Sequence, residues 1–575
     1  MDAGARFPRS SRHQGGWFIG HCRCAEVAGE GFVVLDRGSN HRRCARLVGS
    51  QIFDRTDGQA GRRSDVAGSA FDSDRGLSGA FHREPQLSHY RVDGKRIRHP
   101  RLLPPQHRVR DGAGGIGCRR SRRDRWRCRM SSVVRALRSF VSGSGAIAVV
   151  KAPPGSGKTY TLVESLDAGI KGRQRIVVAA QTNNQVDEIC GRIAARYDKQ
   201  TVIRFSSSGY QRPANTNDRV VYIDRKNAIP DGPLVMVGTV AKLALSKFDG
   251  DFDIIFVDEA WQMAWADFLP MRHAADRYVF IGDPGQIPPT VAIDVDRWES
   301  SDHPPHQATP TLILSNPNLA PLRTELRLPT CRRLPFDSVQ LVNRFYDFEF
   351  DSDAKQGERF IRPTKNVRSG GPAADAVDAA LVAMNASRHP STTSILQMPT
   401  PAAGLPVGTD IELARYTAAV VARLIERRCE VSTAPDEKSA PRMLRSADIG
   451  VVSTHNLMNT AIQNELRALS SKYADIRVTT PERWQGLEKP VMVAVHPLSG
   501  VMSPSAFDLE TGRLCVMSSR HQAACFFVTR DHVSDTLDDH LPLADQALGA
   551  LDAVGKGHAL HREFLAYHRE RNLIV

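Results

Sequence analysis

The residues best suited to chemistry stand in one stretch, Ala146–Thr159, which reads AIAVVKAPPGSGKT. Its apolar start is typical of a strand buried on both faces, and a helical pattern begins at Lys158. The loop between them follows the phosphate-binding pattern G-x-x-x-x-G-K-[ST], with Ala152 where the first glycine is usual. Such a loop binds the phosphates of a nucleoside triphosphate, and its hydroxyl ligates Mg²⁺. The predicted phosphate ligands are Pro154, Gly155, Ser156, Gly157 and Lys158, with Thr159 on Mg²⁺.

Two further apolar runs end in acidic or amide side chains. The segment DIIFVDEAWQ carries Asp258, which we expect to hold Mg²⁺ through water, and Glu259, which we expect to polarise the attacking water. The segment IGDPGQIPP carries Asp283 and Gln286, which are suited to sensing a γ-phosphate. An acidic pair at a strand end or a Pro/Gly turn is common on protein surfaces. After a phosphate loop, however, the two segments together predict the remainder of an NTPase site.

Composition limits the class of protein. A length of 575 residues allows about three or four domains, and 41% hydrophobic with 24% charged residues is ordinary for a globular chain. No apolar run approaches the length of a transmembrane helix, and the N-terminus lacks the apolar core of a secretory signal, so we expect a cytoplasmic protein without membrane contact. The ten cysteines are scattered without a CxxC pair, which predicts free thiols.

The first 130 residues differ from the rest of the chain. They contain 26 Arg and 1 Lys against 13 acidic residues, so they carry the whole net charge of +14, and residues 131–575 are balanced. Three interpretations stay open for this segment. It is a disordered basic arm on nucleic acid, a small module with cysteine and histidine metal ligands, or an out-of-frame translation that precedes true coding sequence near Met130. We assign it no function.

From residue 131 onward, apolar strands alternate with helical patterns in two series. The first series comprises Ala146–Val150, Arg175–Ala180, Leu234–Gly238, Asp253–Val257, Tyr278–Ile281 and Thr311–Leu314. The second comprises Ser394–Gln397, Ile449–Ser453, Ile476–Thr479, Val491–Val495, Leu514–Met517 and Phe526–Thr529. This alternation predicts an α/β chain with two doubly wound parallel sheets. The polar, proline-rich residues 294–310 suit a connector, so we expect domains at 131–310 and 311–575 after the segment 1–130.

The motifs GKT, VDEAWQ and GDPGQIPP, in this order and spacing, resemble those of superfamily 1 helicases, in particular the Upf-like branch. The resemblance implies two RecA-like domains, ATP and Mg²⁺ as cofactors, and Gln262 at the nucleotide. Segments AQTNNQVD and GTVAKL resemble motifs Ia and Ic of that branch, which would place Thr182, Asn183 and Thr239 on the backbone of single-stranded DNA or RNA. For these three residues, an ordinary helix cap or strand-end hydroxyl is the alternative.

The second half of the chain completes the set of motifs. LPTCRRLP resembles motif IV, with Arg332 as the best match for its catalytic arginine and Arg333 as a close alternative. TPERWQGLEKPV resembles motif V and RLCVMSSR resembles motif VI. These motifs imply Gln485 at the nucleic acid, and at the nucleotide Gly486, Glu488 and Arg520.

The sequence thus predicts an ATP-dependent nucleic-acid helicase or translocase that hydrolyses ATP between two RecA-like domains. The expected catalytic residues are Lys158, Glu259, Gln286, Arg332 and Arg520. Two alternatives remain, a nucleic-acid-stimulated ATPase that remodels complexes without unwinding, and an inactive product of a disrupted reading frame. Tryptophans 261, 265 and 484 are candidate base stackers, although core positions suit at least two of them. The sequence identifies no protein partner.

Overall fold

The computed structural model describes residues 122–290, 295–298, 301–386, 390–406, 408–433, 440–540 and 552–575, with side chains from residue 132 onward apart from that of residue 296. Upstream, β1 (Phe18–His21) pairs antiparallel with β2 (Phe32–Leu35), and β3 (Leu47–Val48) with β4 (Gln51–Ile52). The interpretations given above for residues 1–130 otherwise lie outside the described residues. Residues 113–575 form a unit separate from 1–112, and this unit holds every predicted site residue.

The first lobe, residues 132–327, is built on one eight-stranded parallel sheet. Its spatial order is β12-β5-β11-β10-β6-β9-β7-β8. The strands are β5 (Ile147–Lys151), β6 (Arg175–Ala180), β7 (Val202–Phe205), β8 (Val220–Ile223), β9 (Leu234–Thr239), β10 (Ile254–Val257), β11 (Tyr278–Gly282) and β12 (Arg323–Arg327). Every neighbouring pair is parallel, so the loops that follow the central strands open at one edge of the sheet.

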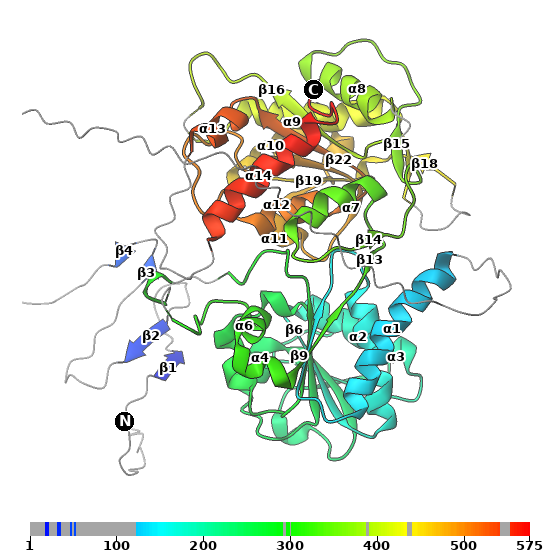
Figure 1. The fold of residues 1–575 in the computed structure, drawn as a ribbon, viewed down its shortest axis with the longest axis vertical. Coiled ribbons are helices and arrows are strands. Elements are labelled where there is room, and N and C mark those ends of the chain that lie inside the picture. Colours follow the sequence, from blue (N-terminus) through cyan, green and yellow to red (C-terminus); the bar gives the residue numbers. More distant parts are fainter. Residues whose placement is uncertain are drawn as a thin grey trace, which may run out of the picture. The chain divides into compact units, whose positions relative to one another are not determined.

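Helices cover both faces of this sheet, which is why its strands are apolar on both sides. One face packs under α1 (Arg122–Ser142), α2 (Lys158–Lys171) and α3 (Asn183–Arg196); the other packs under α4 (Val240–Leu245), α5 (Trp265–Phe268) and α6 (Thr309–Ser315) (Figure 1). Successive side chains of β5 point to opposite faces of the sheet. Ala148 and Val150 pack in the core under α1, α2 and α3, and Val149 packs in the core under α4, α5 and α6.

The second lobe, residues 330–575, has a five-stranded parallel sheet in the order β16-β22-β21-β19-β20. These strands are β16 (Thr393–Met398), β19 (Ile449–Val452), β20 (Arg477–Thr479), β21 (Lys489–Val495) and β22 (His521–Arg530). Two small sheets accompany it. They are formed by β13 (Thr330–Cys331) with β14 (Asp351–Ser352), and by β15 (Phe360–Arg362), β17 (Glu430–Ser432) and β18 (Arg442–Met443).

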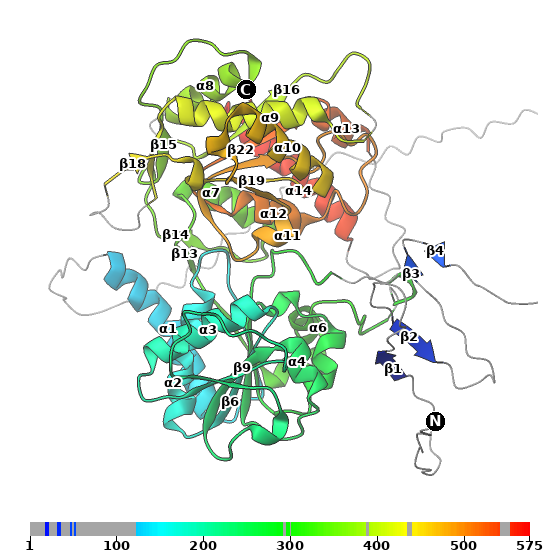
Figure 2. The ribbon, with the colours of Figure 1, turned by 180° about the vertical axis from the view of Figure 1, so that it is seen from behind.

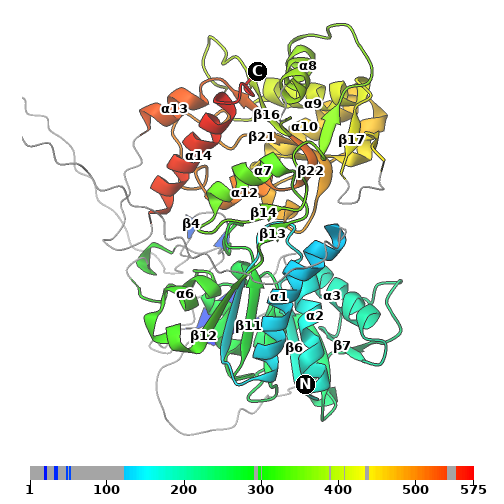
Figure 3. The ribbon, with the colours of Figure 1, turned by 45° about the vertical axis from the view of Figure 1, so that its right-hand side comes forward.

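Helices again form two layers on this second sheet. One layer consists of α8 (Pro372–Asn385), α9 (Ile411–Glu426) and α10 (Asn456–Leu469). The other consists of α7 (Phe336–Val342), α11 (Pro481–Trp484), α12 (Thr511–Ser518), α13 (Val533–Asp539) and α14 (Ala553–Arg569), of which α14 runs along the outside (Figure 3). The 3₁₀ turns of the chain are η1 (Lys226–Ala228), η2 (Ala260–Gln262), η3 (Leu269–Met271), η4 (Asp296–Trp298), η5 (Pro317–Leu322), η6 (Asn343–Phe345), η7 (Ser446–Asp448) and η8 (Ser471–Tyr473).

The two predicted parallel sheets are confirmed, but two predicted strands are helices. Residues 311–314 lie in α6, and residues 514–517 lie in α12. Leu514, Cys515, Val516 and Met517 are all fully buried. A short apolar run surrounded by protein on every side has no periodicity, so sequence alone does not separate a buried strand from a buried helical turn.

The predicted domain boundaries also shift. Strand β12 pairs with β5 in the first sheet, so the first lobe extends past Arg327 and the expected boundary at residue 310 falls too early. The expected start at residue 131 falls inside α1, which begins at Arg122. The polar, proline-rich composition therefore did not mark the end of the first lobe, and the edge strand β12 gave no apolar signal because four of its five residues, RTELR, are polar.

Two expectations drawn from composition concern the described residues. The five cysteines of this region, Cys190, Cys331, Cys429, Cys515 and Cys525, are free thiols in buried positions. In the part of the chain that the structure describes, no helix combines the length and the apolar character needed to cross a membrane.

Five buried histidines lie on or beside the layer formed by α14 and the second sheet, among them His496, His521, His561 and His568. His496 Nε2 lies 3.4 Å from His561 Nδ1, His568 Nε2 lies 3.0 Å from Thr393 Oγ1, and His521 is fully buried. Burial lowers the pKa of His561 and of His521 to about 3, lowers that of His568 to about 4, and holds that of His496 well below its usual value. These side chains are therefore neutral in the folded protein at neutral pH.

We predict that the second lobe loses stability in mild acid. The unfolded chain binds protons on these histidines below about pH 6.5 and the folded chain does not, so the free energy of unfolding is intact above pH 7 and falls as the pH drops toward 4. Each histidine contributes about 1.4 kcal/mol per pH unit in that window. Thermal unfolding of wild type and His568→Gln between pH 8 and pH 5 measures this, and the variant should have a shallower pH slope.

The exposed His303 provides the control for this prediction. His303→Gln should keep the wild-type slope. Equal slopes in His568→Gln and wild type would contradict the assignment of the acid sensitivity to buried histidines.

Candidate functional site

The phosphate-binding loop joins β5 to α2 with two glycines in left-handed conformations. Gly155 has φ 65° and Gly157, the N-cap of α2, has φ 90°, so both positions favour glycine. Ala152 stands outside that region, and its N–H donates to the Gly282 carbonyl at 2.8 Å. Alanine therefore fits where the first glycine of the pattern is usual.

The predicted lysine and carboxylates come together at the carboxyl edge of the first sheet. Lys158 Nζ lies 3.7 Å from both Glu259 Oε1 and Asp283 Oδ2. Asp258 is buried at the end of β10, and burial, followed by the charge of Glu259, raises its pKa to about 7. Glu259 has φ 48°, an unusual value for a non-glycine residue, and such strain is typical of functional sites.

Asp283 is the junction between the two lobes. Its carboxylate accepts hydrogen bonds from Gln286 Nε2 at 2.8 Å and from the hydroxyl of Tyr346, a second-lobe residue, at 2.7 Å. The Tyr346 ring fits because residue 285 is glycine, where an added Cβ would lie 2.5 Å from the ring. Burial, and then the charge of Asp283, hold the pKa of Tyr346 well above its usual value, so its hydroxyl remains a donor.

Sequence reasoning did not identify Tyr346. Its signal is the aromatic cluster FYDFEF, in which Tyr346 packs edge-to-face against Phe348 and Phe350. A second contact between the lobes follows in the chain, because Lys151 Nζ lies 2.7 Å from Asp347 Oδ2.

Arg520 carries a buried cation from the second lobe. Its side chain is 1% exposed, and its Nε and Nη2 atoms have no hydrogen-bond partner. Burial, followed by repulsion from Arg333, lowers its pKa to about 10, while Asp283 and Glu259 attract it. A desolvated guanidinium with free donors is poised for an anion.

The two arginines of the predicted motif IV face different partners. Arg333 pairs with Glu488 and donates from Nη1 to the Ser519 carbonyl at 3.3 Å, beside Arg520. Arg332 pairs instead with Asp353, at 3.5 Å, and its side chain is 34% exposed. The structure therefore favours the alternative, Arg333, as the arginine next to Arg520, in place of the best sequence match.

This arginine segment packs directly on the phosphate loop. The Arg332 N–H donates to the Gly155 carbonyl at 3.0 Å, and a Cβ at Gly155 would lie 2.3 Å from the Cβ of Arg333. The buried Arg359 donates to the carbonyls of both arginines and holds the turn in place. Because Gly155 has no side chain, the arginine segment of the second lobe can pack against the same loop that is predicted to bind phosphate.

The predicted motif V also reaches this cluster. Gly486 has φ 76°, and Glu488 accepts from Arg333 and from Gln522 Nε2, the latter at 2.7 Å. Burial opposes ionisation of Glu488, but Arg333 holds its pKa below the usual value. Glu488 therefore orients Arg333 as an ionised carboxylate.

The unpartnered buried polar atoms of the cleft test whether it fits a nucleotide. They include Ser156 Oγ, Gln262 Nε2, Gln286 Oε1 and the two Arg520 nitrogens. Buried polar groups without partners are rare in folded proteins and are expected where a ligand completes them. Thr159 in the first turn of α2 and Asp258 directly after β10 offer oxygen ligands of the kind that Mg²⁺ prefers, so the residues present fit a Mg²⁺-bound triphosphate.

The predicted nucleic-acid contacts in the first lobe have structural roles of their own. Thr182 caps α3 and accepts from Gln185 N, and Thr239 caps α4 and accepts from Lys242 N. Asn183 Oδ1 accepts from the buried Arg204 at 2.8 Å. These caps are the alternative that the sequence left open, and each threonine hydroxyl keeps its proton for a further acceptor.

The remaining candidates divide between surface and core. Gln485 is half-buried just after α11. Trp261 and Trp484 are buried core residues, as the sequence allowed, and Trp265 is half-buried. Base stacking by Trp261 or Trp484 is therefore excluded in this structure.

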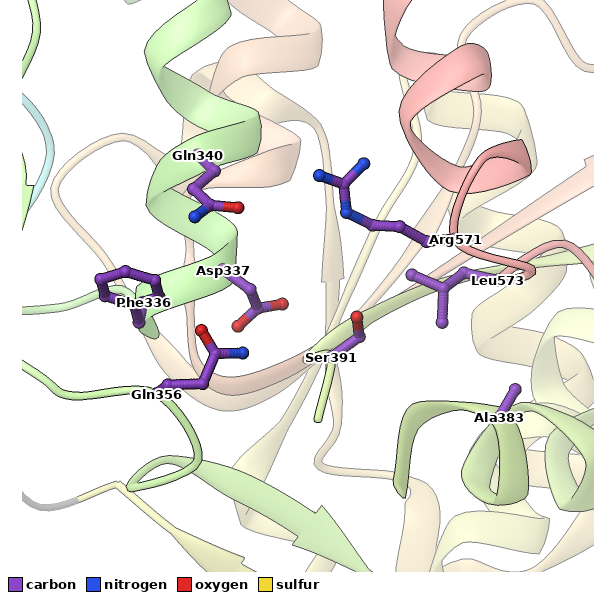
Figure 4. Close-up of a pocket in the computed structure, with 8 residues that line it drawn as sticks. All are labelled: Phe336, Asp337, Gln340, Gln356, Ala383, Ser391, Arg571 and Leu573. Carbon is purple, nitrogen blue, oxygen red and sulfur yellow. The ribbon is translucent and has the colours of Figure 1, made fainter. Parts of the chain in front are cut away.

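A hollow of about 520 Å³ on the second lobe contains none of the predicted site residues (Figure 4). Its lining includes Phe336, Gln340 and Arg571, and the buried Asp337. The Asp337 carboxylate already accepts hydrogen bonds from the backbone N–H and the hydroxyl of Thr392, at 2.7–2.9 Å. This hollow is thus distinct from the cluster around Lys158.

The chain is similar to a known family, to a yeast protein and to solved structures. Residues 131–226 and 235–293 match the AAA_11 family of AAA domains. The DNA replication ATP-dependent helicase/nuclease DNA2 of Saccharomyces cerevisiae is 24% identical over 160 residues, which are 26% of this chain and 10% of that protein. Among solved structures, arterivirus nonstructural protein 10 (helicase) has a TM-score of 0.34 at 12% sequence identity, and the match covers 71% of this chain and 64% of that protein. The structure of the same arterivirus protein in complex with DNA has a TM-score of 0.34 at 14% identity, and the match covers 71% of this chain and 66% of that protein.

The parallel sheets and the phosphate-binding loop define a P-loop NTPase with two lobes. The family match and the yeast relative confirm the resemblance to superfamily 1 helicases, and neither of them tests the Upf-like branch. The chain spans about a tenth of the length of that relative.

The arrangement of the two arginines gives a first prediction about catalysis. Arg333→Ala should lower the kcat of ATP hydrolysis by about 10³-fold, because it removes a cation beside the phosphates, and Arg332→Ala should lower it by less than about tenfold. Steady-state ATPase assays on the two variants measure this. Their substitutions are adjacent in one turn, so each controls for local disruption in the other. A larger loss in Arg332→Ala would restore the original assignment.

The Tyr346–Asp283 bond gives a second prediction. Tyr346→Phe keeps the ring and removes one buried bond to a carboxylate, so kcat should fall by about tenfold while the KM for ATP changes little. The control is Tyr416→Phe, which alters a buried tyrosine of α9 on the opposite face of the second sheet. Equal kcat in both variants would show that the bond does not support catalysis.

Proposed function

We propose that this chain is an ATP-driven motor of the superfamily 1 type that acts on single-stranded DNA or RNA. The observation that carries the proposal is Arg520, a buried guanidinium of the second lobe that has unpartnered donors and is attracted by Glu259 and Asp283 of the first lobe, the two carboxylates next to Lys158. A site with cations on both lobes is complete only when the lobes are together. Because ATP bound between the lobes would hold them together, hydrolysis and product release would allow the lobes to move apart.

The first lobe would bind the triphosphate. The loop N–H groups and Lys158 hold the β- and γ-phosphate oxygens, and Lys158 leaves its present position between Glu259 and Asp283 to do so. Thr159 and Asp258 would hold Mg²⁺, which neutralises phosphate charge when it is bound. Asp258 needs that cation, because its buried carboxyl otherwise keeps a raised pKa.

The reacting groups would come from both lobes. Glu259 orients the attacking water and accepts its proton, and its strained backbone fixes it at the end of β10. Arg333 and Arg520 neutralise the charge that develops on the γ-phosphoryl group, an effect of about 10³–10⁵ in rate for one such arginine. Gln286 would contact the γ-phosphate. Because Gln286 also donates a hydrogen bond to Asp283, a change at the γ-phosphate would affect the position of Asp283.

Asp283 would link nucleotide state to lobe closure. It binds Gln286 within the first lobe and Tyr346 of the second, so loss of the γ-phosphate alters both bonds together. A strand held at Thr182 and Thr239 of the first lobe and at Gln485 of the second would then shift as the cleft opens. Such a grip on backbone and bases is tolerant of sequence.

A second candidate is a strand-stimulated ATPase that remodels protein–nucleic acid complexes without separating a duplex. One observation favours it. Residues 202–223, between the segments like motifs Ia and II, add only the last two strands at one end of the first sheet, β7 and the edge strand β8. A tailed duplex distinguishes the two candidates, because only a helicase releases its complementary strand.

The proposed motor is tested by the ATPase rate of the full chain with and without single-stranded DNA and RNA. We expect stimulation by at least one polymer, dependence on Mg²⁺, and a loss of about 10²-fold or more in Lys158→Ala, which lacks the phosphate-binding cation. Thermal unfolding of the variant confirms that it is folded. A folded wild-type chain without hydrolysis under any condition would refute the proposal.

A further inference from the structure

We infer that Phe507, backed by Arg513 and flanked by His455, is a stacking platform for one base of the single strand. The inference deepens the proposed function and rests on it. Phe507 lies between β21 and α12, and 42% of its surface is exposed, whereas the phenylalanines of the two main cores are buried. An exposed aromatic ring at a fixed position is the feature on which sequence-tolerant strand binding depends.

The ring is held in place from one side. Arg513 Cζ lies 3.8 Å from the ring centroid, and Arg513 Nη1 donates to the Phe507 carbonyl at 3.1 Å. The guanidinium is fixed in turn by Glu482, which accepts from its Nε at 3.0 Å. A cation thus lies over one face of Phe507, and the 42% exposure of the residue leaves part of its surface open to a base.

The segment around the ring is ordered by its own contacts. Asp508 accepts from the backbone N–H and the hydroxyl of Ser505, and the next residue, Leu509, is 1% exposed in the core. A preorganised ring loses little conformational freedom when a ligand binds, so its stacking energy is available for affinity.

The neighbours of the ring suit a nucleotide. The His455 ring is exposed at the N-terminus of α10, and its centroid lies 5.6 Å from that of Phe507 at an interplanar angle of 31°. The platform therefore combines two aromatic rings with a guanidinium. Aromatic rings stack on bases, and the cationic and hydrogen-bonding groups beside them suit the adjoining phosphate.

The platform also lies close to Gln485, which is predicted to contact the strand, and to the segment of Gln286, which is predicted to contact the γ-phosphate. Glu482, which holds Arg513, lies on α11, just before Gln485, and α11 and α12 lie side by side (Figures 1 and 2). At the start of α12, Gly512 touches the first lobe, since a Cβ there would lie 2.6 Å from Ile287 N. Gly512, which packs against residues 286 and 287, directly precedes Arg513, which contacts the Phe507 ring, so a base on Phe507 would lie near the segment that contains Gln286.

The test compares two fluorescent strands of equal length and phosphate number, oligothymidylate and an abasic strand, in binding titrations with the full chain. Phe507→Ala should weaken oligothymidylate binding by about tenfold, as expected for one lost stack, and leave abasic binding within about twofold. Phe507→Trp should keep the affinity, and oligothymidylate should quench its fluorescence beyond any change in wild type.

Phe336→Ala is the matched control, because Phe336 is also an exposed phenylalanine of the second lobe, 38% exposed, in the hollow of Figure 4. It should bind both strands as wild type does. Thermal unfolding checks the fold of each variant.

The remaining outcomes overturn the inference in different ways. Equal weakening on both strands would assign Phe507 a structural role. Unchanged strand binding with a change in oligomeric state would make it a protein contact, with the proposed function intact. A wild-type chain that binds neither these strands nor oligouridylate of the same length would refute the proposed function and the platform together.

Discussion

The candidate site depends on opposite charges that meet in a buried cleft. Arg520 is withdrawn from water without a hydrogen-bond partner on two of its nitrogens, and Lys158 rests between Glu259 and Asp283 at 3.7 Å from each. In such a low-dielectric place, unpaired charges are costly and correctly placed ones act strongly. The triphosphate of the proposed function would supply negative charge to these donors.

Glycines make the contact between the lobes possible. Gly155 lies against Arg333, Gly285 against Tyr346, and Gly512 against the backbone of residues 286 and 287. A Cβ at any of them would lie within 2.6 Å of the other lobe. Because glycine has no side chain, the phosphate-binding loop and residues 285–287 each pack directly against the second lobe.

The charge distribution bears on how a strand is held. The excess positive charge lies in residues 1–130, and the two lobes have no net charge, so a strand bound by the lobes relies on local groups. Thr182 and Thr239 each use their side-chain oxygen to accept a hydrogen bond as a helix cap. Stacking on Phe507 adds a contact that needs neither net charge nor a free backbone group.

The sequence by itself determined the two parallel sheets, the phosphate loop and the acidic strand ends, because these depend on residue type and on spacing within one short segment. The tertiary structure decided the rest. It placed Arg333 rather than Arg332 beside Arg520, brought Tyr346 to Asp283, and made residues 514–517 helical. Neighbouring arginines are equivalent in a motif, and only packing against residues far away in the chain orients one of them toward the cleft. Contacts between distant segments leave no local period, so they are known only when the chain is folded.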